Sequence, residues 1–206
     1  MEGLLTSKST LPAAARSIVD SVMVALSGQK AADTQGSVVI ESLDSLSSNQ
    51  MLDNARKLLT DYGGFVAAKP GIAHFCYGAL ESEVASLPNS YTENGGGVLL
   101  ASIDSRHIGF VAWRTLPNPA LANAWEVKRL WVTPAARCKG IGRILVEAII
   151  DRARAAGKSE LLLDTAPAEM PSAHQLYIDL GFHPCPPYDG PEMPGIQYMS
   201  LHLSTP

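Results

Sequence analysis

Hydrophobic residues follow two spacings along this chain, one typical of β-strands and one of amphipathic helices. Runs rich in aliphatic, β-branched and aromatic residues predict strands at 38–43, 98–103, 108–113, 125–132, 161–164 and 196–203, with a further short strand beginning at Phe182. Apolar residues three and four positions apart predict helices at 49–62, 72–85, 141–156 and 173–180. The order of these elements predicts an α/β protein.

Turn-forming residues separate the predicted elements. Ser105-Arg106-His107 joins two of the strands as a hairpin, and Gly157 and Gly181 stand where two helices are expected to end. Residues 184–194 contain five prolines, which predicts an irregular loop. Residues 1–36 are rich in Ala, Ser and Thr, and we expect a flexible or short helical extension before one globular domain at 37–206.

One connection combines glycine with basic residues. The segment Arg137-Cys138-Lys139-Gly140-Ile141-Gly142-Arg143 lies between the strand at 125–132 and the following helix. Backbone N–H groups converge at the start of a helix, where the helix dipole is positive, and glycine lets an anion approach them closely. The segment therefore predicts a phosphate-binding turn, with a strand–helix connection that binds no ligand as the alternative.

Charge is distributed unevenly along the chain. The net charge is −4, yet residues 126–158 hold eight Lys and Arg against three Asp and Glu. A basic segment in an acidic protein suits a small anionic ligand, whereas a nucleic-acid surface would make the whole domain basic. For this reason we expect no nucleic-acid partner. We also expect no membrane partner, because no apolar run is long enough to span a bilayer. Part of the basic charge is explained by the solvated face of the helix from 141.

The cysteines and histidines predict neither a disulfide framework nor a metal site. Cys76, Cys138 and Cys185 are widely spaced and odd in number, which indicates a reducing compartment. We therefore expect a cytoplasmic location, with mitochondrial targeting by residues 1–35 as the alternative.

The spacing Arg137-x-x-Gly140-x-Gly142 resembles the acetyl-CoA signature of the GNAT superfamily of N-acetyltransferases. Three further segments extend the resemblance in the right order: Trp125 to Val132, Leu161 to Asp164, and Ala173-His-Gln-Leu-Tyr-Ile-Asp-Leu-Gly-Phe182. Met170 stands where the family often has asparagine. The resemblance spans about residues 37–203. It implies the GNAT fold, a central mixed sheet of six to seven strands flanked by about four helices, with two splayed parallel central strands.

The resemblance implies acetyl-CoA as the acyl donor. On the central strand, the backbone of Leu130, Trp131 and Val132 is expected to contact the pantetheine arm, with one N–H facing the thioester oxygen. The pyrophosphate is expected on the turn that follows, formed by Arg137, Cys138, Lys139, Gly140, Ile141, Gly142 and Arg143. No metal is implied.

Catalytic roles also follow from the resemblance. Tyr177 matches a family tyrosine that protonates the leaving thiolate; the alternative is a core tyrosine of an amphipathic helix. Glu126 is the candidate general base, acting through a water, unless it is solvated or paired with Lys128 or Arg129. The acceptor is expected against the first two helices and the last hairpin, with these polar candidates: Tyr62, Glu81, Glu83, Tyr91, Tyr188, Asp189 and Tyr198. Glu81, Glu83 and Asp189 would suit a cationic amine, with ordinary surface acids as the alternative.

The leading hypothesis is an acetyl-CoA-dependent N-acetyltransferase. It would transfer an acetyl group to a primary amine of a small molecule, by direct attack in a ternary complex, as a monomer or homodimer. The alternatives are a protein lysine or N-terminal acetyltransferase and a CoA-binding sensor without turnover. The proline-rich loop at 184–194 favours the small molecule, because it is expected to cover the site. The sequence does not name the amine.

Overall fold

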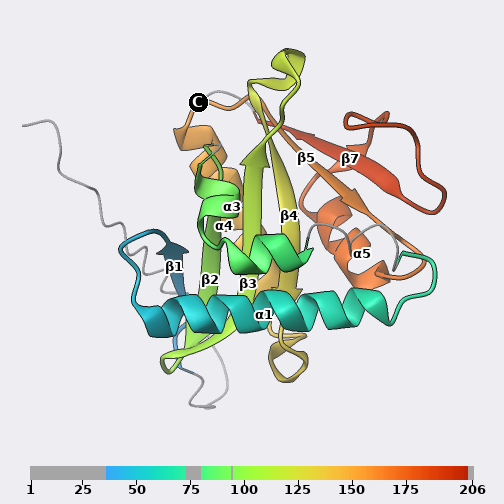
Figure 1. Ribbon diagram of the computed structural model, residues 1–206. Coiled ribbons are helices and arrows are strands. Elements are labelled where there is room, and N and C mark those ends of the chain that lie inside the picture. Colours follow the sequence, from blue (N-terminus) through green and yellow to red (C-terminus); the bar gives the residue numbers. More distant parts are fainter. Residues whose placement is uncertain (1–35, 73–79, 94, 204–206) are drawn as a thin grey trace, which may run out of the picture.

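A seven-stranded mixed sheet forms the centre of the fold in the computed structural model, which describes residues 36–72, 80–93 and 95–203 (Figure 1). The strand order is β1-β2-β3-β4-β5-β7-β6. Only β4 and β5 run parallel to each other. The strands are β1 (Val39–Leu43), β2 (Gly97–Ile103), β3 (Arg106–Thr115), β4 (Ala124–Val132), β5 (Glu160–Thr165), β6 (His183–Pro184) and β7 (Gln197–His202). The predicted mixed sheet is confirmed.

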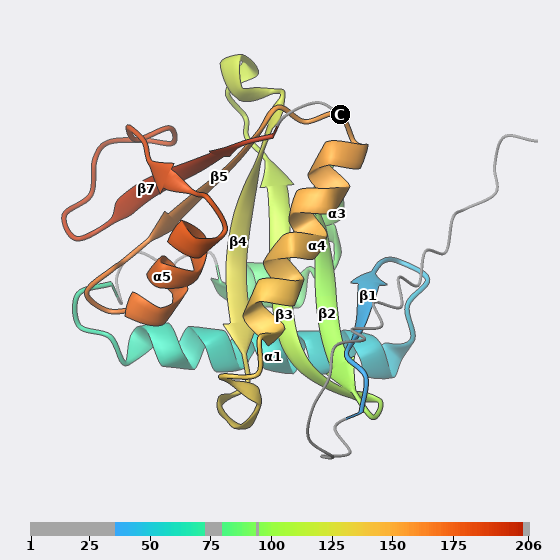
Figure 2. The same ribbon diagram turned by 180° about the vertical axis from the view of Figure 1, so that it is seen from behind.

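Helices cover both faces of this sheet. One face carries α1 (Asn49–Ala67), the helical residues 80–85 and α3 (Asn89–Thr92), as Figure 1 shows. The opposite face carries α4 (Ile141–Ala155) and α5 (Pro171–Asp179), seen in Figure 2. Single 3-10 turns at Pro119–Leu121 and Pro134–Ala136 lie on either side of β4.

Each face has its own hydrophobic core. Leu145, Ile149 and Leu163 are fully or almost fully buried between the sheet and α4. Leu59 and Phe110, both fully buried, belong to the core under α1. The helical and strand periodicities of the sequence are explained by these two cores, because each element turns its apolar side toward the sheet.

Several element ends differ from the predicted ones. Helix α1 continues past Tyr62 to Ala67, because Val66 packs into the core and Gly63 lets Leu80 approach the helix closely. The β2–β3 turn lies at Asp104 and Ser105, which both have positive φ, so β3 already begins at Arg106. The predicted N-terminal extension up to residue 35 and the part of the second predicted helix at 73–79 lie outside the described residues.

The two parallel strands separate after a short paired stretch. Their register covers Ala124 to Glu126 of β4, and it ends where Glu126 lies opposite Leu162. Beyond that point β5 stays paired with β7 through Thr165. Strand β4 stays paired with β3 but contains a bulge, at which Arg129 has φ 60°. The predicted splay of the central strands is confirmed.

Candidate active site

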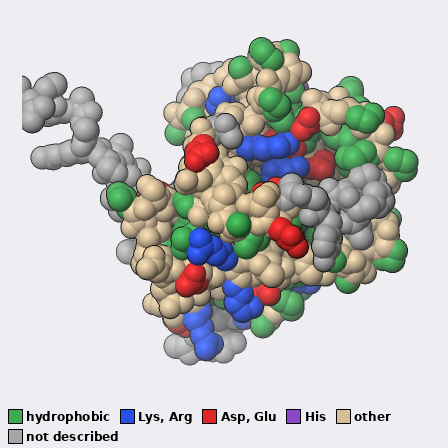
Figure 3. Space-filling view, in the orientation of Figure 1, with side chains coloured by type: hydrophobic (Ala, Val, Ile, Leu, Met, Phe, Trp, Pro, Cys, Tyr) green, Lys and Arg blue, Asp and Glu red, His purple; other side chains and the backbone are tan. Residues whose placement is uncertain are grey.

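Two adjacent hollows lie where β4 and β5 separate. The inner cavity, of about 190 Å³, is lined by residues of β4 from Glu126 to Leu130, the end of β5, α5, the loop at 188–196 and Tyr198 of β7. The outer groove is lined by the end of β4, the turn before α4 and the start of α5. Both hollows are lined by Tyr62, Leu130, Met170 and Ala173. The two hollows are therefore adjacent, and together they are called the channel. Figure 3 shows basic and acidic side chains next to one another on this face of the molecule.

The glycine turn forms one wall of the outer groove. Gly140 caps α4 with φ 77°, a conformation that favours glycine, and Ile141 begins the helix. A Cβ built at Gly142 would lie 3.4 Å from the Leu176 side chain, and the side chains of Val132 and Leu130 are next nearest. The first N–H groups of a helix have no intrahelical partner. This wall therefore suits a phosphate that is bound by backbone N–H groups.

The basic residues of the turn differ in what they contact. The guanidinium of Arg137 lies 4.6 Å from the Trp131 ring centre and 5.3 Å from that of Phe65, and its Nε donates to the Val132 carbonyl at 3.1 Å. Lys139 is exposed. Arg143 lies 3.7 Å from Glu147 and 3.5 Å from Asp179. Cys138 is exposed and has φ 61°.

Tyr177 lies on α5 and lines the inner cavity. It is 7% exposed, and its ring packs edge-on against Phe182 with centres 5.8 Å apart. Its hydroxyl has no hydrogen-bond partner within the part of the chain that the structure describes. Burial raises the pKa of Tyr177 above its ordinary value, and the nearby Tyr62 and Asp164 raise it further. The hydroxyl is therefore protonated at neutral pH and free to donate to a group in the cavity.

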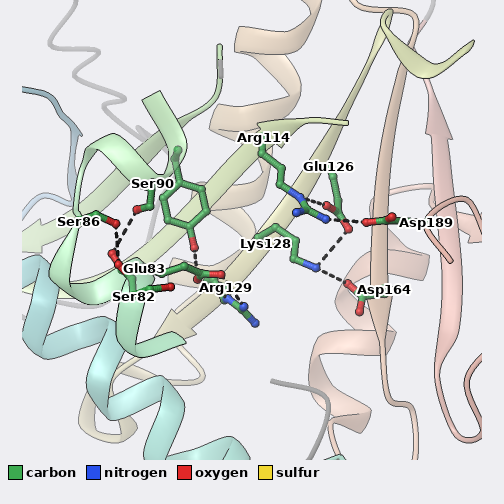
Figure 4. Close-up of polar contacts among 11 residues, drawn as sticks. Ser82, Glu83, Ser86, Ser90, Arg114, Glu126, Lys128, Arg129, Asp164 and Asp189 are labelled. Atoms are coloured by element: carbon green, nitrogen blue, oxygen red, sulfur yellow. Dashed lines mark hydrogen bonds and ion pairs between the residues drawn. The ribbon is translucent and has the colours of Figure 1, made fainter. Parts of the chain in front are cut away.

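Glu126 is buried at the centre of an ion-pair network (Figure 4). One carboxylate oxygen accepts from the Arg114 Nε. The other accepts from Lys128 at 3.2 Å and from the Tyr188 hydroxyl at 3.1 Å. The sequence left Lys128 and Arg129 open as partners, and the structure pairs Glu126 with Lys128 and Arg114. Both carboxylate oxygens of Glu126 are thus engaged.

Lys128 extends the network across the split between the strands. Its ammonium lies 3.1 Å from Asp164 of β5, and each of the two residues lies two positions past the last paired residue of its strand. Burial by itself lowers the pKa of Lys128, but the attraction of Asp164 and Glu126 outweighs it, so the pKa lies above its ordinary value. The charged ammonium of Lys128 therefore links β4 to β5 through its ion pair with Asp164.

A second network holds the bulge of β4 (Figure 4). The Arg129 guanidinium makes two hydrogen bonds of 2.9 Å to the Glu83 carboxylate, which also accepts from the Tyr91 hydroxyl at 2.7 Å. The side chains of Arg129 and Glu83 are 9% and 20% exposed. Burial acts to raise the pKa of Glu83, but the hydrogen bonds and charge of Arg129 outweigh it and the pKa is lowered. The pair ties the bulge to the helical segment at 80–85.

The predicted acceptor residues divide into two groups. The inner cavity is lined by Tyr62, Tyr188, Asp189 and Tyr198. Glu81, which is exposed, and the residues Glu83 and Tyr91 line neither hollow. Sequence reasoning did not single out Arg114 or Asp164. Asp164 stands beside leucines in a buried strand, and such a charge in an apolar run is a signal that could have found it.

The described residues contain no group of three or more His, Cys, Asp or Glu placed to hold a metal ion. Among the same residues, no helix combines the length and the hydrophobicity needed to cross a bilayer.

The sequence matches the model of a known family. The model of the family described as "Acetyltransferase (GNAT) family" matches residues 71–182, more than half of the chain. The protein belongs to the GNAT acetyltransferase family.

Individual relatives agree with this assignment. An uncharacterized N-acetyltransferase of Schizosaccharomyces pombe is 33% identical over 110 residues, which cover 52% of this chain and 65% of the relative. Human N-acetyltransferase 8 is 29% identical over 120 residues, which cover 57% of this chain and 52% of the relative. The chain thus spans less than two thirds of each of these relatives.

Solved structures share the fold. The structure of yncA from Salmonella typhimurium with its cofactor acetyl-CoA superimposes with a TM-score of 0.63 at 18% identity, covering 81% of this chain and 94% of that one.

Proposed function

We propose that the protein is an acetyl-CoA-dependent N-acetyltransferase that acetylates a primary amine of a small molecule. The observation that carries the proposal is the adjacency of two hollows: the outer groove is lined by Gly140 and Gly142, and the inner cavity beside it is lined by Tyr177. Family membership supports acetyl transfer, and the acetyl-CoA in the yncA structure supports the same donor here.

The residues of the outer groove fit the donor. Gly140 and Gly142 leave the groove wall without side chains, and Arg137 adds positive charge beside Trp131. We assign the pyrophosphate to the N–H groups of this turn and the pantetheine arm to the backbone of Leu130 to Val132. Acetyl-CoA supplies a thioester whose acetyl group an amine can attack.

Tyr177 is assigned as the acid of the reaction. An acceptor bound as an ammonium first loses one proton to water. The neutral amine nitrogen then bonds to the acetyl carbon while the carbon–sulfur bond breaks, and the nitrogen loses its surplus proton to water. Tyr177 donates a proton to the sulfur and regains one from solvent. Because Arg114, Lys128 and Tyr188 engage both oxygens of Glu126, we assign Glu126 to holding these groups in place.

A small-molecule acceptor is supported by the loop at 188–194. Its residues Tyr188, Asp189 and Met193 line the inner cavity, so the loop forms one of the cavity walls. A protein lysine or N terminus would need an open groove for its flanking residues. The loop therefore favours a compact acceptor over a peptide.

Tyr177→Phe is expected to lower kcat by about 100-fold, because the variant keeps the ring packing but loses the donor hydroxyl. The affinity for acetyl-CoA should change by less than about twofold, since the ring of residue 177 stays in place. Stopped-time assays of thiol release measure kcat, and calorimetry measures the affinity. An unchanged kcat would remove Tyr177 from the acid role.

The proposed function is tested by incubating the purified protein with acetyl-CoA and a panel of small primary amines while free thiol is measured. Release of CoA that depends on one class of amine, with the acetylated amine found by mass spectrometry, is the expected result. Acetyl-CoA binding without release from any amine would instead favour the sensor. Release that requires a peptide would favour protein acetylation.

A further inference from the structure

The cations of the inner cavity are already neutralised. Lys128 faces Glu126 and Asp164 at 3.2 and 3.1 Å, and Arg129 makes both of its described carboxylate contacts with Glu83. Arg114, behind the cavity, contacts Glu126 and Asp189. A carboxylate entering the cavity would therefore have to compete with these partners.

Two carboxylates of the cavity, in contrast, each have an oxygen that accepts no hydrogen bond from the described residues. Asp164 accepts from Lys128 through Oδ1 and Asp189 accepts from Arg114 through Oδ2, and in both the second oxygen receives no hydrogen bond from the described residues. Their side chains are 30% and 48% exposed. Open carboxylate oxygens at the cavity suit a ligand that donates hydrogen bonds and is positively charged.

The charge balance points the same way. The two networks hold four carboxylates, Glu83, Glu126, Asp164 and Asp189, against three cations, Arg114, Lys128 and Arg129. One negative charge is thus left over, which one ammonium group would neutralise.

Buried hydroxyls and apolar side chains complete the cavity. Thr165, 2% exposed, and Tyr177, 7% exposed, line it without a hydrogen-bond partner for their hydroxyls among the described residues. The remaining wall is largely apolar or aromatic, formed by Ile72, Val127, Met170, Met193, Ile196 and the tyrosines 62, 188 and 198. Such a wall suits an aromatic or aliphatic body.

We infer that the inner cavity selects an acceptor with one ammonium group on an aromatic or aliphatic body and without a carboxylate. Asp164 and Asp189 receive the ammonium through their open oxygens, and Asp164 lies nearer the split between the strands. This inference rests on the proposed function, because it makes the cavity the acceptor site. It excludes free amino acids as preferred substrates.

Three ligands that share one body test the inference: phenethylamine, phenylalanine and phenylalaninamide. The protein is saturated with CoA, which cannot acetylate them, and each ligand is titrated by calorimetry at pH 7. Phenethylamine should bind at least about 30-fold more tightly than phenylalanine, because the added carboxylate meets no free cation. Phenylalaninamide has the same size as phenylalanine but no negative charge, and it should bind within about fivefold of phenethylamine.

Substitution of each aspartate tests whether its carboxylate binds the ammonium group of the ligand. Asp164→Asn should weaken phenethylamine binding by about 10-fold, because one negative charge is removed. The ratio between the affinities for phenethylamine and phenylalanine should therefore become smaller. Asp189→Asn should act in the same direction. Glu192→Gln is the matched control, since Glu192 is exposed in the same loop and does not line the cavity, and it should change nothing. Unaltered acetyl-CoA affinity in each variant shows that the fold is kept.

Three outcomes would overturn the inference: phenylalanine binding as tightly as phenethylamine, phenylalaninamide binding as weakly as phenylalanine, or no effect of both aspartate variants. Lack of binding by all three ligands would overturn it as well. These results are independent of turnover. Thiol release from acetyl-CoA that is at least as fast with phenylalanine as with phenethylamine would preserve the proposed function and reject the selectivity. Binding of phenethylamine without thiol release from any amine would reject the proposed function.

Discussion

Gly142→Trp is expected to lower the affinity for acetyl-CoA by more than about 1,000-fold, equivalent to about 4 kcal/mol, while the fold stays intact. Position 142 borders the outer groove, and a Cβ there already lies 3.4 Å from Leu176. An indole attached to that Cβ has only the groove to occupy, so it would fill the place assigned to the pyrophosphate. Calorimetric titration with acetyl-CoA measures the loss.

Gly142→Ala is the matched control for this variant. The contact of its Cβ with Leu176 is an ordinary van der Waals distance, and Gly142 does not have the positive φ that an alanine would disfavour. The alanine variant should therefore bind acetyl-CoA within about threefold of the unmodified protein. Equal binding by the tryptophan variant, with its circular dichroism spectrum unchanged, would show that the donor lies elsewhere.

Arg129→Met is expected to lower the free energy of unfolding by about 3–5 kcal/mol. The substitution leaves the Glu83 carboxylate largely buried with only the Tyr91 hydroxyl to donate to it among the described contacts. Adding Glu83→Gln to this variant should restore part of the loss, because the unpaired charge is removed. Urea unfolding measures all three proteins.

An exposed pair provides the comparison for Arg129. Arg154 lies 3.4 Å from Asp151, and the two side chains are 49% and 77% exposed. Arg154→Met should cost no more than about 0.5 kcal/mol, because water screens such a pair. A similar small cost for Arg129→Met would mean that the bulge of β4 does not depend on its contact with Glu83.

The stabilisation by the Glu83–Arg129 pair should also depend on pH. The pKa of Glu83 is lower in the folded chain than its ordinary value of 4.5, so the folded state favours the carboxylate. The contribution is therefore complete above that value and is lost as the pH falls through the lower, folded pKa. The difference in unfolding free energy between the unmodified protein and Arg129→Met should shrink from pH 6 toward pH 3; a difference that grows on acidification would contradict the assigned pair.

Most of the fold could be predicted from the sequence because its elements carry regular hydrophobic spacings. The helix from Ile141 and the strand ending at Val132 show this most clearly. Helix α3 was not predictable, since the four residues Asn89–Thr92 are too few to show a helical repeat. The extension of α1 to Ala67 was hidden by Gly63, which disfavours a helix in isolation and is tolerated here because Leu80 packs against it.

The candidate site was predictable where local sequence determines it. The glycine turn lines the outer groove, and its place is set by the connection between one strand and the next helix. Tyr177 lines the inner cavity, and its place is set by the apolar face of a single helix. The partners of Glu126 were not predictable, because they depend on the alignment of different strands. Arg114 lies opposite Glu126 only through the β3–β4 register, and Asp164 meets Lys128 only because β5 runs parallel to β4.

The central claim, that the channel between β4 and β5 holds acetyl-CoA, is tested most directly by calorimetric titration of the unmodified full chain with acetyl-CoA. We expect saturable binding at one site per chain with a dissociation constant in the micromolar range, which corresponds to a binding free energy on the order of −8 kcal/mol. The heat should disappear in Gly142→Trp and persist in Gly142→Ala. Absence of binding by the folded, unmodified protein would contradict the assignment of the channel to acetyl-CoA.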